Sequence, residues 1–304
     1  MQSASHRLLP DGRRLHLHHG PIDLIVEAQG PAAEVQAART QAVARFQTVL
    51  TELVAELPLL RRAVAGGACP LTGPVARRMW AAVQPHRPAF VTPMAAVAGA
   101  VADEVLAALT AGRTLTRAYV NNGGDIALFL APGAQAWRAG IVVDPADPRS
   151  PGALTVRPDM PVRGIATSGR LGRSLSLGIA DSVTVLAGTA AEADAAATLI
   201  ANAVDLPGHP AVARQPAREM QPDSDLGDRP VTTAVGPLAP EDVAAALTAG
   251  RHAAEAMRAR GLIAAAVLVL DRQVRLVGAP DLLMAPPSPR RLSTPSQRED
   301  RIHA

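Results

Sequence analysis

The sequence predicts a protein of mixed helices and strands, of the α/β or α+β class, with one large domain or two medium ones. Two observations predict this class. Some segments repeat apolar residues at helical spacing, and short apolar runs bounded by Gly and Pro lie between them. The chain has 304 residues, 48% of them hydrophobic, and can therefore bury a sizeable core. The Pro- and Arg-rich residues 281–304 are expected to form a disordered tail.

Each element follows from its local pattern. Helices are expected where apolar residues recur every three or four positions, and Pro58 should end the first of them. The expected helices are 32–57, 75–83, 93–109, 190–204 and 240–260. The expected strands are two around Gly20-Pro21, two around Gly123-Gly124, and 139–144, 152–157, 163–169, 181–188, 263–270 and 273–277. Residues 207–230 are rich in Pro and Arg without periodicity, which predicts a linker or long surface loop.

Composition and charge exclude several classes of function. The chain has 30 basic side chains, all of them Arg, against 27 acidic ones, which leaves a formal net charge of only +3. It has two Trp, one Tyr and three Phe. Few rings and a small net charge argue against nucleic-acid and membrane binding. Without Lys, neither Schiff-base chemistry nor a Walker-type phosphate lysine can occur.

The sequence also favours a compartment. Cys69 is the only cysteine, so the chain can form no internal disulfide and no cysteine-based zinc site. The first 20 residues have no apolar core and do not read as a signal peptide. We therefore expect a cytoplasmic protein.

The first candidate site is the run NNGGDI. Gly123 and Gly124 allow a backbone with positive φ to approach a ligand, while Asn121, Asn122 and Asp125 supply polar contacts. The alternative is an ordinary hairpin turn of the Asn-Gly type. Spacing alone favours the turn.

The second candidate is the end of a strand, GIATSG. Thr167 and Ser168 present two hydroxyl groups and Gly169 an open amide, which suit a phosphate or a carbonyl oxygen. The alternative is an ordinary strand end.

The third candidate is the run ADAAAT. Asp194 and Thr198 are four residues apart and share a face if the segment is helical. A carboxylate and a hydroxyl are oxygen ligands of the kind Mg²⁺ prefers. The alternative is a carboxylate near a helix N-terminus that interacts with the helix dipole. A further cluster, His16, His18 and His19, is expected to be a surface feature. Only His16 and His18 would face the same side of a strand, and no third metal ligand is spaced nearby.

In series these motifs resemble the ApbE superfamily, the flavin transferases that move FMN from FAD onto a protein threonine with Mg²⁺. The chain is most similar to the uncharacterised ApbE-like branch. The resemblance covers residues 13–280 and rests on four stretches: TPMAAVAGAVADEV (92–105), YVNNGGDIAL (119–128), GIATSGRLGRSLSLGIADSVTV (164–185) and AEADAAATLIANAV (191–204).

The resemblance implies an ApbE-like α+β fold, mixed α/β, with a ligand cleft. It places a single domain at residues 13–280, after an N-terminal extension at 1–12. It also implies roles for the motif residues. One residue lies near the metal, three contact FAD, three line the flavin pocket and two coordinate Mg²⁺. In that order these residues are Gly99, then Gly123, Gly124 and Asp125, then Thr167, Ser168 and Gly169, then Asp194 and Thr198.

Two departures from the transferase pattern bear on activity. The transferases have Lys-Gly where this chain has Ala98-Gly99. They also carry His-x-x-Asp-Pro-x-x-Gly after the Thr-Ser-Gly strand, and here that interval has no His and no Asp-Pro pair. Arg173, Ser174 and Ser176, together with Arg170, could instead hold an anion, because guanidinium suits phosphate and carboxylate.

These observations predict an ApbE-like protein that binds an anionic or nucleotide-type small molecule, FAD among them, with Mg²⁺. Asn122 and Asp125 would orient the ligand, Thr167, Ser168 and Arg173 would bind its anion, and Asp194 and Thr198 would hold the metal. One alternative is a non-catalytic accessory protein for cofactor handling. Another, less favoured, is a retained FAD:protein FMN transferase. A homodimer and an unidentified protein partner are left open.

Overall fold

The computed structural model describes residues 3–140, 153–278 and 283–284. Its main feature is a nine-stranded sheet in the order β1-β2-β3-β4-β5-β8-β9-β12-β13, with every neighbouring pair antiparallel. The strands are β1 Ser5–Leu8, β2 Leu15–His19, β3 Ile22–Gln29, β4 Arg117–Asn122, β5 Asp125–Leu130, β8 Gly164–Ser168, β9 Ser182–Ala187, β12 Ala265–Leu270 and β13 Gln273–Gly278. Helices and strands are thus mixed along the chain, which confirms the predicted α+β class.

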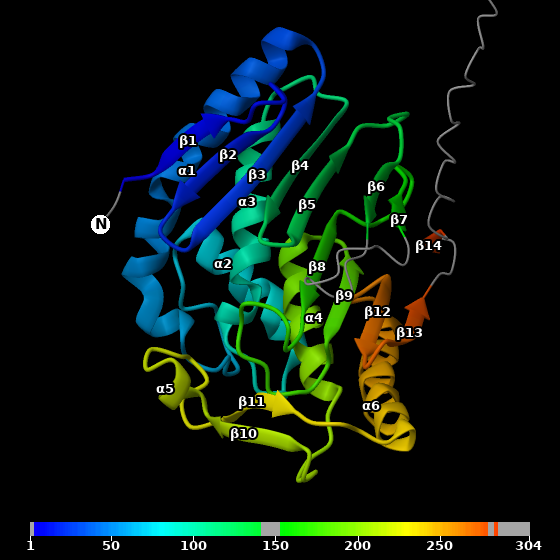
Figure 1. Cartoon of the computed structure of the whole chain (residues 1–304). Coiled ribbons are helices and arrows are strands. Elements are labelled where there is room, and N and C mark those ends of the chain that lie inside the picture. Colours follow the sequence, from blue (N-terminus) through cyan, green and yellow to red (C-terminus); the bar gives the residue numbers. More distant parts are fainter. Residues whose placement is uncertain (1–2, 141–152, 279–282, 285–304) are drawn as a thin grey trace, which may run out of the picture.

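The helices cover one face of this sheet (Figure 1). They are α1 Ala32–Leu60, α2 Pro74–Val83, α3 Val97–Thr110, α4 Ala190–Ala203 and α6 Pro240–Ala259, with the short 3₁₀ helices η1 Gln84–His86 and η2 Pro93–Ala96. In β3 the residues Ile22, Leu24 and Val26 are buried against the helices while Asp23 and Ile25 point the other way. The predicted alternation is therefore confirmed.

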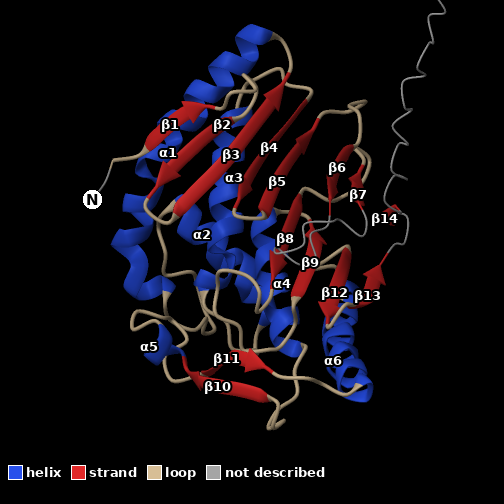
Figure 2. Ribbon diagram, viewed as in Figure 1, coloured by secondary structure: helices blue, strands red, loops and turns tan. Residues whose placement is uncertain are grey.

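A smaller sheet lies on the opposite face, in the order β14-β7-β6 (Figure 2). Its strands are β6 Trp137–Gly140, β7 Ala153–Val156 and β14 Leu283–Met284. Leu154 and Val156 join a separate apolar cluster with residues of β5, β8, β9 and β12. The expected strand at 139–144 and the expected disordered tail at 281–304 lie largely outside the described residues.

Two expectations about the elements need correction. The first helix does not end at Pro58 but continues to Leu60. Proline removes only its own N–H donor, and the next hydrogen bond, from Arg61 N–H to the Leu57 carbonyl at 3.0 Å, still forms. Residues 5–8 of the expected N-terminal extension pair with β2 as an edge strand.

The expected linker at 207–230 contains regular structure. It holds β10 Val212–Pro216 and α5 Ala217–Met220, and β10 pairs with β11 Pro230–Val235. This hairpin lies beyond the ends of the long strands, apart from the main sheet (Figure 1). A register shift between Ala213 and Arg214 interrupts the pairing, which accounts for the lack of a strand pattern in the sequence.

Among the described residues, one segment is long and apolar enough to cross a membrane by length and composition, namely Pro93–Thr110. It comprises η2 and α3, which pack against α1, α2 and α4 and against the sheet. In this fold it is a core helix, and it carries Gly99 to the first turn of α4.

Candidate ligand and cation site

The structure brings most of the predicted site residues to one cavity of about 300 Å³. The cavity lies where β5, β8 and α4 meet the start of α3. The predicted residues that line it are Asp125, Thr167, Ser168, Gly169, Arg173, Ser174, Asp194 and Thr198. Residues up to 73 positions apart in the sequence, from Asp125 to Thr198, therefore converge on one site, in agreement with the motif-based expectation.

The first carboxylate of the site belongs to Asp125, the first residue of β5. Only 8% of this residue is exposed, and its carboxylate accepts a hydrogen bond from Thr167 N–H at 3.2 Å. Burial raises the pKa of Asp125, and the single N–H donor offsets only part of that rise. The site therefore holds a desolvated carboxyl group, and a nearby positive charge would stabilise its ionised form.

The second carboxylate belongs to Asp194, on α4. It accepts a hydrogen bond from Gly99 N–H at 3.0 Å. Burial raises the pKa of Asp194, and the negative charge of Asp125 raises it further. No ion pair joins either carboxylate to an arginine or histidine of the described chain. Two carboxyl groups that disfavour each other's ionisation thus share one cavity.

Gly99 is buried and does not line this cavity; it sets the distance between α3 and α4. A Cβ atom at this position would lie 2.2 Å from the Ala190 carbonyl oxygen, so only glycine allows the two backbones to approach this closely. The resemblance placed Gly99 near the metal. In the structure the N–H group of Gly99 donates a hydrogen bond to Asp194, the residue to which the resemblance assigns the metal.

The first turn of α4 is fixed by three side chains. Thr189 and Glu192 form a reciprocal capping box. From α3, the Asp103 carboxylate accepts hydrogen bonds from the N–H groups of Ala190 and Ala191 at 3.0 and 2.9 Å. Burial raises the pKa of Asp103 to about 6 despite these two donors. The helix that carries Asp194 and Thr198 is therefore anchored at its N-terminus.

The donor set suits a hard cation. Thr198 lies one turn after Asp194 on α4 and lines the same cavity. No group of three or more His, Cys, Asp or Glu side chains able to hold a metal occurs in the described part of the chain. Two carboxylates and a hydroxyl match Mg²⁺, which commonly keeps several waters or phosphate oxygens as its other ligands.

The Gly123-Gly124 pair forms the turn between β4 and β5. The two glycines have φ of +65° and +118°, and Asn122 pairs with Asp125 across the turn. Asn122 Nδ2 donates to the Ala98 carbonyl at 3.1 Å, so it ties the hairpin to α3 and does not line the cavity. The hairpin alternative therefore describes the backbone here, and the turn sets the position of Asp125.

Gly123 and Gly124 do line a neighbouring cavity of about 600 Å³. Gly172 and Arg173 border this second space as well as the first, so the two cavities adjoin along the loop after β8. The expectation that these glycines approach a ligand remains a prediction for this second space.

The loop after β8 carries both predicted anion-binding arginines, and they differ in whether they are already paired. Gly169 has φ of +147°, and a Cβ there would lie 2.5 Å from the Asp181 carbonyl oxygen. Arg170 is paired with Asp181 at 2.5 Å. Arg173 is exposed and forms no ion pair with a described residue. Of the two arginines, Arg173 is therefore the one available to an anion.

Ser176 does not lie where the sequence analysis placed it. It is buried, its hydroxyl accepts a hydrogen bond from Gly178 N–H at 3.3 Å, and its carbonyl accepts one from Thr232 N–H. Its backbone thus holds β11 against this loop. Ser174, two residues earlier, does line the cavity.

The sequence analysis missed one wall of the cavity. Gln221, Ser224, Asp225 and Leu226, all within the expected loop at 207–230, line it from the side of α5. The Thr92 hydroxyl is 2.5 Å from Asp225 Oδ2 and joins this wall to η2. The segment has no periodic signal, and this long-range contact could not be read from spacing.

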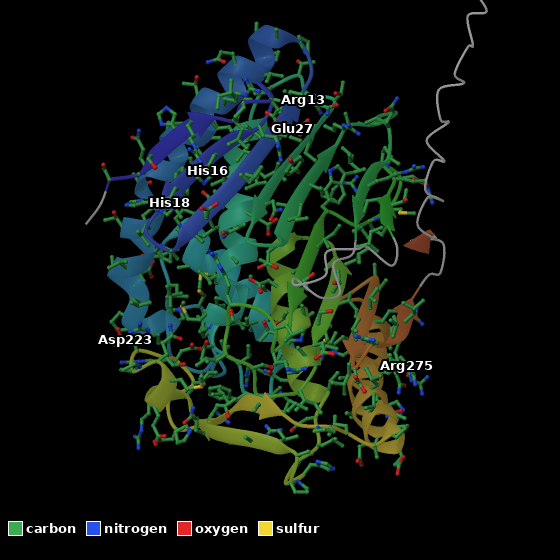
Figure 3. The ribbon with its side chains drawn as sticks, viewed as in Figure 1. Arg13, His16, His18, Glu27, Asp223 and Arg275 are labelled. Atoms are coloured by element: carbon green, nitrogen blue, oxygen red, sulfur yellow. The ribbon has the colours of Figure 1, made fainter. Side chains whose placement is uncertain are left out.

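None of the three histidines of the cluster lines this cavity. His16 and His18 project from β2 (Figure 3), and His16 Nε2 lies 3.1 Å from Asp23 Oδ1. The expectation of a surface feature needs one correction, because His19 is 5% exposed and packs edge-on against Phe46.

The fold and the cavity together define an α+β protein with a carboxylate-lined pocket beside a glycine hairpin. A family profile described as AbpE bacteria matches residues 6–276, so the chain belongs to this family. The match spans all four stretches on which the ApbE resemblance rested, and it confirms that resemblance.

The chain is also similar to curated proteins that carry the name UPF0280 protein. With that of Methanocorpusculum labreanum it shares 33% identity over 171 residues, 56% of this chain and 70% of the relative. With that of Methanothermobacter thermautotrophicus it shares 38% identity over 136 residues, 44% of this chain and 50% of the relative. The chain thus spans about half the length of the latter protein.

Two solved structures are distant likenesses. The apo form of the Pseudomonas stutzeri flavinyl transferase ApbE gives a TM-score of 0.41 at 13% identity, covering 92% of this chain and 95% of that one. The flavin transferase ApbE from Vibrio cholerae gives a TM-score of 0.35 at 16% identity, covering 92% and 98%.

Proposed function

We propose that this protein binds an anionic, nucleotide-type small molecule together with Mg²⁺ in the 300 Å³ cavity, and that it does so in the cytoplasm. One observation carries the proposal. Asp125 and Asp194 face the same cavity, burial raises the pKa of both, and neither has a cationic partner in the described chain. A divalent cation would offset the charge of both carboxylates.

The residues divide into those that would hold the cation and those that would face the ligand. Asp194, Thr198 and Asp125 supply oxygen atoms for the cation. Arg173 and Ser174, together with the strand end at 167–169, supply cationic and hydrogen-bonding groups to the same cavity. When bound, Mg²⁺ would neutralise the charge of phosphate oxygens next to the two carboxylates. FAD is the first nucleotide to test, because the family resembles flavin transferases.

Binding without flavin transfer is the reading that the chemistry of this chain favours. The position before Gly99 is Ala98, which cannot carry charge. The interval between β8 and β9 contains no histidine, and its Arg170 and Asp181 form an ion pair with each other. The described walls of the cavity thus offer ligand-binding groups but no histidine for proton transfer.

The test is a thermal-shift series with FAD, FMN and ATP, each with MgCl₂ or with EDTA. A ligand that binds only the folded state stabilises it by about 2.7 kcal/mol at a hundredfold excess over Kd. We expect at least one nucleotide to raise Tm in MgCl₂ and to lose most of that effect in EDTA.

The matched variants are Asp194→Asn in the cavity and Asp223→Asn on the exposed surface near α5 (Figure 3). We expect Asp194→Asn to abolish the Mg²⁺-dependent shift and Asp223→Asn to retain it. A shift that survives in Asp194→Asn would refute the metal assignment. No shift with any of the three nucleotides would refute the nucleotide class.

Turnover separates an enzyme from an accessory protein. The binding reading predicts that a bound nucleotide is recovered unchanged after prolonged incubation with Mg²⁺. Cleavage of FAD to FMN and AMP under these conditions would favour the enzymatic alternative.

A further inference from the structure

A second cavity lies on the face of the main sheet that points away from the helices. It encloses about 270 Å³, and its principal lining residues are Arg13, Glu27, Gln29, Arg117, Tyr119 and Trp137. These come from the loop before β2, from β3 and β4, and from β6 of the smaller sheet. Because Ala28 of β3 and Val120 of β4 are buried in the apolar core on the helix side, this cavity and the carboxylate site open on different faces of the sheet.

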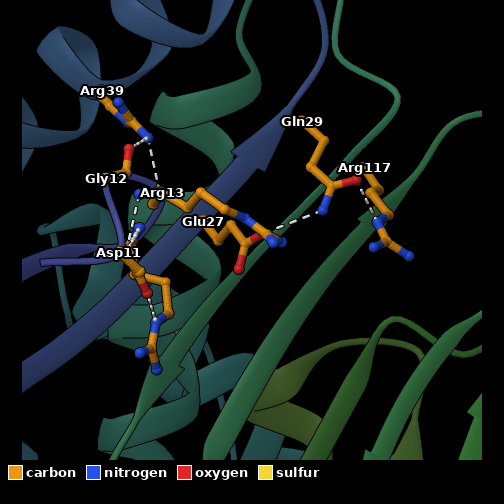
Figure 4. Close-up of polar contacts among 8 residues, drawn as sticks. Asp11, Gly12, Arg13, Glu27, Gln29, Arg39 and Arg117 are labelled. Atoms are coloured by element: carbon orange, nitrogen blue, oxygen red, sulfur yellow. Dashed lines mark hydrogen bonds and ion pairs between the residues drawn. The ribbon is translucent and has the colours of Figure 1, made fainter. Parts of the chain in front are cut away.

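A chain of hydrogen bonds organises the polar wall of this cavity (Figure 4). Arg13 Nη2 pairs with Glu27 Oε1 at 2.6 Å. Gln29 Nε2 donates to the same Glu27 oxygen at 3.1 Å, and Gln29 Oε1 accepts from Arg117 Nε at 2.8 Å. Gln29 thereby fixes the Arg117 guanidinium through its inner nitrogen. The two outer nitrogens of Arg117 form no hydrogen bond with a described residue.

The other wall is aromatic. The rings of Tyr119 and Trp137 lie 6.2 Å apart, tilted by 57°. The chain has only one Tyr and two Trp, so two of these three residues meet in this cavity. Both are partly buried beside the apolar cluster under β6 and β7. An aromatic ring with a polar tip can contact a planar ligand while its body remains packed.

We propose that this cavity binds a small molecule that combines an aromatic ring with a carboxylate or phosphate group. The ring would pack on Tyr119 and Trp137, and the anion would bind the outer nitrogens of Arg117. Arg13 is already neutralised by Glu27, so the described lining residues carry a net positive charge through Arg117 and Arg138. Its volume is near the small end of ligand pockets, about 300 Å³. That size suits a single ring system.

The test uses anthranilate, a fluorescent aromatic carboxylate that accepts energy from tryptophan. In a Trp80→Phe background, Trp137 is the only tryptophan, and excitation at about 295 nm, at the red edge of tryptophan absorption, avoids Tyr119. We expect saturable energy transfer from Trp137 to anthranilate in EDTA, and no competition by aniline or inorganic phosphate, which each lack one half of the proposed ligand. If phenyl phosphate competes with anthranilate, the ligand class includes phosphates. If it does not compete, the class is restricted to carboxylates.

Two further variants decide the assignment. Arg117→Leu should weaken anthranilate binding at least tenfold, whereas Arg275→Gln, on the far strand β13 (Figure 3), should leave it unchanged. Asp194→Asn should also leave it unchanged, so the result is independent of the Mg²⁺ proposal. Absence of saturable transfer, or equal affinity in the Arg117→Leu and Arg275→Gln proteins, would overturn the proposal and leave the two rings as a cover for the apolar cluster.

Discussion

The N–H group of Gly99 donates to the Asp194 carboxylate at 3.0 Å, and this bond joins α3 to the α4 residue that would hold a cation. The bond requires close contact between two helices, and its donor and acceptor are 95 positions apart in the sequence. That contact exists because position 99 has no side chain. The geometry of the cavity therefore depends on helix packing as much as on the residues that line it.

Replacing Gly99 with alanine should disturb that packing. The new Cβ would lie 2.2 Å from the Ala190 carbonyl oxygen and would push α3 away from α4. We expect a loss of about 1–3 kcal/mol in the free energy of unfolding, together with a weaker response to Mg²⁺. Gly236→Ala is the control, because its Cβ would meet nothing closer than 3.5 Å. Urea unfolding of both variants measures the difference, and equal stability would contradict the packing argument.

Asp125 should make the metal-free protein less stable as pH rises. Burial raises the pKa of Asp125 to about 7, so the folded state binds a proton that the unfolded state has already released above pH 4. The free energy of unfolding should thus fall between about pH 4 and pH 7. Asp125→Asn removes this contribution, because asparagine does not titrate.

The measurement is urea unfolding in EDTA at pH 5 and pH 8. We expect Asp125→Asn to be more stable than the wild type by on the order of 1 kcal/mol at pH 8, with a smaller difference at pH 5. A stability difference that is independent of pH would show that the Asp125 pKa is not raised.

Two neighbouring carboxylates on α3 should respond to pH with opposite signs. Burial raises the pKa of Asp103 to about 6. Burial also acts on Glu104, but its contacts with Arg45 and Arg78 at 2.9 and 2.8 Å outweigh it and hold its pKa below the usual range. Asp103 therefore costs stability as pH rises from about 4 to 6, whereas Glu104 contributes stability that is lost as pH falls below about 4.

The paired variants are Asp103→Asn and Glu104→Gln. Relative to the wild type, Asp103→Asn should gain stability between pH 4.5 and 7, offset by a weaker cap on α4. Glu104→Gln should lose about 1–2 kcal/mol at pH 7 and recover as the pH falls towards 3. Chemical denaturation at several pH values gives both slopes, and slopes of the same sign would contradict the assignments.

The wall of the cavity formed near α5 depends on the contact between Thr92 and Asp225. Thr92 is 2% exposed, so Thr92→Val keeps the packing while it removes the hydroxyl. We expect backbone amides of residues 217–229 to exchange faster with solvent by about fivefold, the equivalent of about 1 kcal/mol. Thr248→Val on the exposed surface of α6 is the control. Unchanged exchange in Thr92→Val would mean that this hydrogen bond does not hold the wall.

Periodic signals in the sequence predicted most of the elements, because burial on one face imposes them. The alternation at 22–26 became β3, and the spacing of Phe46 and Leu53 became the buried face of α1. The failures occurred where no single buried face exists. The β10–β11 pair is one case, since a bulge and its partly exposed residues leave no pattern.

The candidate site was predictable only through its motifs. Asp194 and Thr198 share a helical face by spacing alone, but their meeting with Asp125 depends on the order of β5, β8 and β9 in the sheet. The spacing of Gly99 could not indicate that it acts through its N–H, or that Ser176 is buried beneath β11. These roles arise from packing between distant segments, which a local pattern does not encode.

The most direct test is isothermal titration of Mg²⁺ into metal-free protein at pH 8, with the Asp125→Asn, Asp194→Asn and Asp223→Asn variants in parallel. The proposed site predicts one Mg²⁺ per chain for the wild type and for Asp223→Asn, and affinity reduced at least tenfold in each of the two cavity variants. The same Mg²⁺ affinity in all four proteins would contradict the assignment of the cation to the Asp125–Asp194 cavity.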